Sequence, residues 1–112
     1  MQKRDFYIYQ EDLIKYSVTK ENVTISKLVE DLNVKYCEND MRRLRTETIT
    51  NFLIKQGYLF RDKNARKRPT LKGKILGIEV GYILDEDGNK YLTNLYTMKA
   101  QKYIIDNIYD MI

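Results

Sequence analysis

TETITNFLIKQGYLFRDKNARKRPTLKG, residues 46–73, joins the clearest helical pattern of the chain to its densest run of positive charge. Ile49, Phe52 and Leu53 recur at the spacing of one helix face. Thr46 is the expected N-cap, and Gly57 stands where a helix commonly ends in a left-handed residue. The pattern therefore predicts a helix between Thr46 and Gly57.

The opposite face of this helix is short and polar. A helical wheel with about 100° per residue places Glu47, Asn51 and Lys55 there, with Thr48 and Thr50 at its margins. Such side chains can reach base edges in the major groove of DNA. We expect Thr48, Asn51 and Lys55 to read bases. The alternative is an exposed helix face that binds nothing.

Positive charge is concentrated around this helix. Residues 41–75 contain eleven basic and two acidic residues, a net charge of +9, whereas the whole chain carries +4 and the remainder therefore −5. This polarisation predicts an anionic partner, although a solvated basic loop is the alternative. The expected phosphate-binding residues are Arg42, Arg43, Arg45, Arg61, Lys63, Arg66, Lys67, Arg68, Lys72 and Lys74.

The first forty residues read as a helical region. YQEDLIKY, residues 9–16, predicts a short helix. TISKLVEDLNV, residues 24–34, predicts a longer helix, because its apolar side chains recur at i, i+3, i+4 and i+7 behind the N-cap candidate Thr24. Residues 35–45 are polar and weakly periodic, so we expect a connection there.

The segment after Gly57 predicts strands and turns. Residues 58–62 alternate like a short strand, and residues 63–68 form a basic loop. A short helical turn is expected to end near Gly77. Residues 79–84 and 90–97 flank an Asp-Gly turn and predict a β-hairpin.

The last residues, 98–112, predict a C-terminal helix with two apolar stripes. One stripe can pack on the rest of a single domain that spans residues 1–112; it comprises Ala100, Tyr103, Ile104, Asn107, Ile108 and Met111. The second stripe, Ile105, Tyr109 and Ile112, lies roughly opposite. It predicts a homodimer, and a helix buried on both sides is the alternative.

Composition argues against catalysis. The chain has no histidine and a single Cys37, which removes the usual general base, the usual metal ligand and any internal disulfide. We expect no enzyme activity, no cofactor and no bound metal. No apolar run approaches the roughly 18 residues of a membrane span, so a cytoplasmic protein without membrane contact is expected.

The ten tyrosines offer a further interpretation as a stacking platform for bases. Most of them, including Tyr82, Tyr91, Tyr96 and Tyr103, fall on positions predicted to face the core or to pair across strands. We therefore expect mainly structural roles for them.

The order of helices, basic loop and hairpin over residues 24–97, followed by a helix, resembles a winged helix-turn-helix domain. ITNFLIKQGYL, RPTLKGKILGI and AQKYIIDNI are similar to tracts of small DNA-binding proteins from phages and mobile elements of low-GC Gram-positive bacteria. The resemblance implies an α+β fold and a sequence-specific double-stranded-DNA-binding transcriptional regulator. A two-fold dimer would place two recognition helices about one DNA turn apart on a palindromic site.

The sequence departs from this pattern at the hairpin tip. Asp85, Glu86 and Asp87 would repel DNA, so the basic segment at residues 61–69 is expected to face phosphate instead. Two other functions stay open. A phage-encoded inhibitor or adaptor could present the acidic tip to a host nucleic-acid enzyme, and an RNA- or single-strand-binding module could use the tyrosines.

Overall fold

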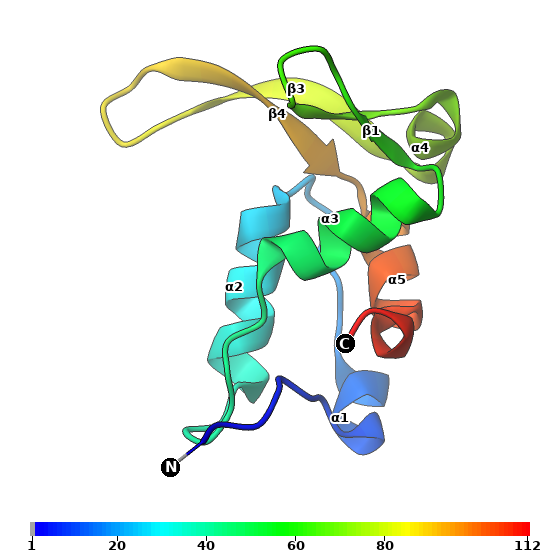
Figure 1. Cartoon of the computed structure of the whole chain (residues 1–112). Coiled ribbons are helices and arrows are strands. Elements are labelled where there is room, and N and C mark those ends of the chain that lie inside the picture. The colour runs from blue at the N-terminus through cyan, green and yellow to red at the C-terminus, as the bar shows by residue number, and fades with distance from the viewer. Residues whose placement is uncertain (1) are drawn as a thin grey trace.

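The computed structural model describes residues 2–112 and has an α+β fold (Figure 1). Within these residues it contains five α-helices, one 3-10 helix and two two-stranded antiparallel sheets. The elements are α1 (Gln10–Lys15), α2 (Ile25–Tyr36), α3 (Thr46–Lys55), β1 (Leu59–Arg61), β2 (Lys67–Pro69), α4 (Leu71–Leu76), β3 (Ile78–Leu84), β4 (Lys90–Tyr96), α5 (Met98–Asp106) and η1 (Ile108–Asp110). The predicted helix between Thr24 and residue 34 and the predicted hairpin after residue 78 are confirmed.

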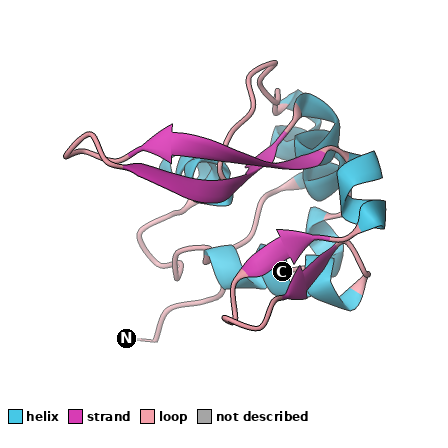
Figure 2. Ribbon diagram, turned by 90° about the horizontal axis from the view of Figure 1, so that it is seen from above, coloured by secondary structure: helices cyan, strands magenta, loops and turns pink. Residues whose placement is uncertain are grey.

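Two hairpins dominate the second half of the chain. Strands β1 and β2 form the short hairpin, in register from Leu59 opposite Pro69 to Arg61 opposite Lys67. Strands β3 and β4 form the long hairpin, which projects beyond the helices as an arm (Figures 1 and 2). The basic loop predicted at residues 63–68 is shorter in the structure, because its last two residues belong to β2.

The two hairpins close with the same turn. In the short hairpin, Asp62 Oδ1 accepts hydrogen bonds from the backbone N–H groups of Asn64 at 2.8 Å and Arg66 at 3.0 Å. In the long hairpin, Asp85 Oδ1 accepts from the backbone N–H groups two and four residues on, at 2.9 and 2.8 Å. The fourth residue of each turn has a positive φ, 62° at Ala65 and 82° at Gly88.

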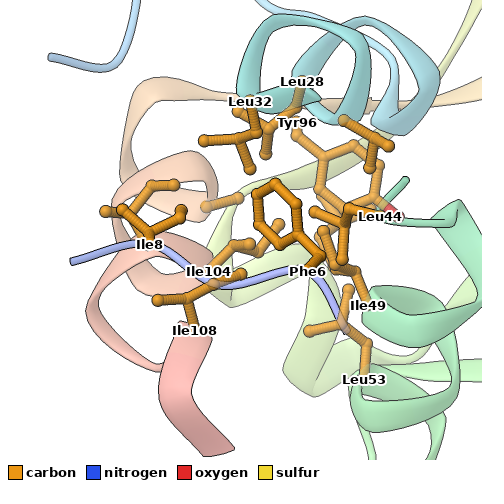
Figure 3. Packing of buried hydrophobic residues seen from close by; sticks show 14 of the residues in the cluster. Phe6, Ile8, Leu28, Leu32, Leu44, Ile49, Leu53, Tyr96, Ile104 and Ile108 are labelled. Atoms are coloured by element: carbon orange, nitrogen blue, oxygen red, sulfur yellow. The ribbon is translucent and has the colours of Figure 1, made fainter. Parts of the chain in front are cut away.

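The hydrophobic core lies between α2, α3, α5 and an extended N-terminal segment (Figure 3). Phe6 and Ile8 of this segment are buried in the core, whereas the alternating residues Tyr7 and Tyr9 are exposed. A parallel bridge between Arg4 and residue 41 holds this segment beside the connection from α2 to α3. Apolar burial of this kind is the main stabilising contribution to the fold.

Three of the five α-helices in the described residues begin behind a capping threonine, and α1 and α3 do not. Thr24, Thr70 and Thr97 each accept a hydrogen bond from a backbone N–H in the first turn of α2, α4 and α5. The prediction that Thr46 caps α3 is wrong: Arg45 is the N-cap residue, its side chain makes no cap bond, and Thr46 is already helical. The left-handed residue expected at Gly57 is confirmed, with φ of 83°.

Short helix α4 joins the two hairpins through a close contact at Gly73. A Cβ atom at this position would fall on the carbonyl oxygen of Tyr58, so only glycine lets α4 approach the end of α3. The helix ends at Gly77 in a left-handed conformation, φ 112°, as the sequence predicts.

The C-terminal helix differs from the prediction, and two tyrosines of the long hairpin meet only one of the two expectations stated for them. Helix α5 ends at Asp106 and a 3-10 turn follows, so the expected second stripe is broken. Ile105 is buried, because the N-terminal half of the chain covers this side of α5. Tyr82 and Tyr91 are exposed on the long hairpin and do not face the core, but they pair across its strands with Leu92 and Ile83, as expected. None of the helices in the described residues is both long and apolar enough to cross a membrane.

Candidate nucleic-acid interface

Helix α3 presents a polar face to solvent. Asn51 and Lys55, one turn apart, are exposed, whereas Thr48 is half-buried at the edge of the face. Glu47 shares the face, and its pKa is lowered mainly by a hydrogen bond from its own backbone N–H at the helix start. Since a carboxylate is favourable there, Glu47 supports the N-terminus of α3 in place of the missing cap.

The short hairpin is fixed to one flank of this face. Lys67 Nζ donates a hydrogen bond of 2.8 Å to Thr50 Oγ1, and Thr50 is buried. The carbonyl of Lys67 in turn accepts from Asn94 Nδ2 of the long hairpin at 2.9 Å. These contacts link α3 to both hairpins. The Thr50 contact also takes one of the three N–H donors of the Lys67 ammonium, a group that the sequence analysis assigned to phosphate.

The loop of the short hairpin presents its positive charge outward. Asp62, its single carboxylate, bonds inward to the turn, and the backbone N–H of Arg66 is the largest cause of its lowered pKa. The side chains of Arg61, Lys63 and Arg66 are exposed. Arg68 is half-buried and donates to the Lys67 carbonyl at 3.0 Å, so it contributes mainly to the hairpin itself.

On the other flank, three arginines line a groove at the start of α3. The groove has a volume of about 370 Å³; its remaining lining includes the hydroxyl-bearing Thr48 and apolar side chains from both ends of the chain. Arg42 forms an ion pair of 2.8 Å with Asp5, and Arg45 lies 4.0 Å from a carboxylate oxygen of Glu47. Among the described residues Arg43 forms no ion pair, so it is the most available cation of the three.

The two lysines of α4 have different surroundings. Lys72 Nζ donates to the carbonyl of Gln56 at 2.7 Å and lies 4.4 Å from the centre of the Tyr58 ring. It therefore stabilises the C-terminal end of α3. Lys74 is exposed. The predicted phosphate-binding residues thus divide into cations that face solvent and cations that already hold the fold together.

The three residues predicted to form a dimer interface also make contacts within the same chain. Tyr109 Oη donates to the Ile8 carbonyl at 2.6 Å, and its ring stacks on Tyr7 with 5.6 Å between ring centres. Ile112 lines the groove at the start of α3, and Ile105 is buried. The predicted second stripe is therefore not a continuous exposed face: Ile105 is buried, whereas Tyr109 and Ile112 are exposed.

Sequence reasoning missed the groove, because its walls come from residues far apart in the chain. The alternation of buried Phe6 and Ile8 with exposed Tyr7 and Tyr9 was the available signal for an extended N-terminal segment. Nothing in the order of residues indicated that this segment would pass beside Arg42.

The described residues contain no group of three or more metal-ligating side chains. Compared with protein-family models, curated proteins and solved structures, the chain gives no significant match.

Proposed function

We propose that this chain is a sequence-specific double-stranded-DNA-binding protein of the winged-helix type, a non-catalytic transcriptional regulator from a phage or mobile element. The observation that carries the proposal is the position of the short hairpin. It follows α3 directly, is hydrogen-bonded to its Thr50 flank, and presents Lys63 and Arg66 beyond it. In a winged helix a hairpin flanks the recognition helix in this order.

In this proposal α3 enters the major groove. Its ten residues span about 15 Å, and the groove is about 12 Å wide. Asn51 can pair with adenine through both amide atoms, and Lys55 can donate to guanine. Arg43, Lys63 and Arg66 then bind phosphates on the two sides of the helix, which fixes its orientation without reading sequence.

The test is a fluorescence-anisotropy titration of the protein against two DNA duplexes. One is the sequence upstream of the gene that encodes this protein, and the other is a scrambled version of it. The native protein should prefer the upstream duplex. Asn51→Ala should lose about five- to 150-fold of the affinity for that duplex and little for the scrambled one, since a bidentate base contact contributes about 1–3 kcal/mol. Asn39→Ala, an exposed amide truncation outside α3, is the control. Equal losses on both duplexes would refute base reading by Asn51.

A further inference from the structure

The long hairpin carries an apolar face that the rest of the chain leaves open. Val80, Tyr82, Leu84 and Leu92 lie on one side of it, because residues paired across an antiparallel ladder point the same way and Tyr82 is opposite Leu92. Lys90, opposite Leu84, lies on the same side, and its Nζ is 5.7 Å from the centre of the Tyr82 ring. Tyr82 is 66% and Leu84 64% exposed. An isolated two-stranded hairpin is marginally stable in water, and an exposed apolar face of this kind marks a contact surface.

This face begins beside the chain's own short hairpin. Asn94, opposite Val80 in the ladder and therefore on the same side, bonds to the Lys67 carbonyl of β2. The other end of the face is the acidic turn with Glu86 and Asp87. Each copy of the chain thus has a basic loop at the base of the arm and an acidic tip at its end.

We propose that the long hairpin is a self-association arm and that its occupant is the long hairpin of a second copy. A two-fold axis between the two apolar faces, at right angles to the strands, lays the arms antiparallel. Each arm has seven residues per strand and is about 23 Å long, so each tip reaches the base of the other arm. Glu86 and Asp87 of one copy then meet Lys63 and Arg66 of the other.

The proposed contact places apolar surface against apolar surface and opposite charges against each other. Apolar side chains cover each other at the centre of the interface, and opposite charges meet at its two ends, a pattern that fixes the antiparallel orientation. The self-association does not depend on DNA binding. Under the function proposed above, the dimer and DNA compete for the same basic loop.

The first experiment is sedimentation velocity of the full chain without DNA. The native protein should form a dimer at about 0.05 M salt that weakens several-fold at about 0.5 M, since added salt shortens the range of the charge contacts. Leu84→Ser, at an exposed position, should weaken the dimer while leaving the circular dichroism spectrum unchanged. A native protein that stays monomeric at low salt would overturn the proposal and leave the arm to a different partner.

A charge exchange then tests the pairing itself. The tip variant, Glu86→Lys with Asp87→Lys, and the loop variant, Lys63→Glu with Arg66→Glu, leave both turn-forming aspartates in place. Each variant alone should dimerise at least tenfold more weakly than the native protein. An equimolar mixture should form a heterodimer, because every tip again meets a loop of opposite charge.

The control for the tip variant is Glu30→Lys with Asp106→Lys, which changes the net charge equally at exposed positions outside the arm. It should dimerise like the native protein. Failure of the mixture to associate, or equal weakening in the control, would overturn the tip-to-loop pairing. Neither result bears on DNA binding, because no DNA is present.

Discussion

Replacing Lys63 and Arg66 together by alanine should remove two phosphate contacts from the DNA complex. Each contact releases condensed counterions and contributes about 0.9 to the slope of log affinity against log salt. The slope should therefore flatten by about 1.8, and affinity at about 0.1 M salt should fall by up to about sixtyfold. Lys67→Ala should flatten the slope less, because its side chain is half-buried and one of the three N–H donors of its ammonium is bonded to Thr50, which holds it against α3.

The assay is fluorescence anisotropy over a salt series on the upstream and the scrambled duplex. The double variant should weaken both complexes alike, since phosphate contacts carry no sequence information. Lys20→Ala with Lys102→Ala removes the same charge from exposed sites outside the basic window and is the control. An unchanged slope in the loop variant, or the same flattening in the control, would refute the assignment of this loop to phosphate.

Three further predictions concern the scaffold. Gly73→Ala should destabilise the fold by about 3 kcal/mol in urea unfolding, because its Cβ would collide with the carbonyl of Tyr58. Ala65→Gly should stabilise it by about 0.5 kcal/mol in the same assay, since an alanine at φ 62° is strained and a glycine is not. The hydrogen bond from the Tyr16 hydroxyl lowers the pKa of Asp31, so the stability difference between native protein and Asp31→Asn should be present at neutral pH and shrink as pH falls below about 4.

Local signals predicted the elements that depend on neighbours in sequence. Helix α2 was readable from its apolar spacing and from Thr24, and α4 from Thr70 and Gly77, because caps and left-handed ends are determined within one turn. The polar face of α3 was equally readable, since Asn51 and Lys55 are placed by helix geometry alone.

Features that depend on distant segments were not readable. The tyrosines of the long hairpin alternate like core residues, yet no other layer covers the arm, so Tyr82 and Tyr91 are exposed. Ile105 was expected to lie on an uncovered stripe of the C-terminal helix. It is buried, because the N-terminal half of the chain reaches α5. Likewise, the Lys67 ammonium donates a hydrogen bond to Thr50 Oγ1, and only tertiary packing brings these two residues together.

The two hairpin turns explain how one chain carries both an acidic and a basic tip. Both turns rest on a leading aspartate that accepts two backbone hydrogen bonds and on a fourth residue with positive φ. These requirements leave the side chains of Lys63 and Arg66, and of Glu86 and Asp87, free to vary. The turn geometry is therefore shared while the charge is opposite, and exchanging the charges should alter the proposed pairing between arms without altering either turn.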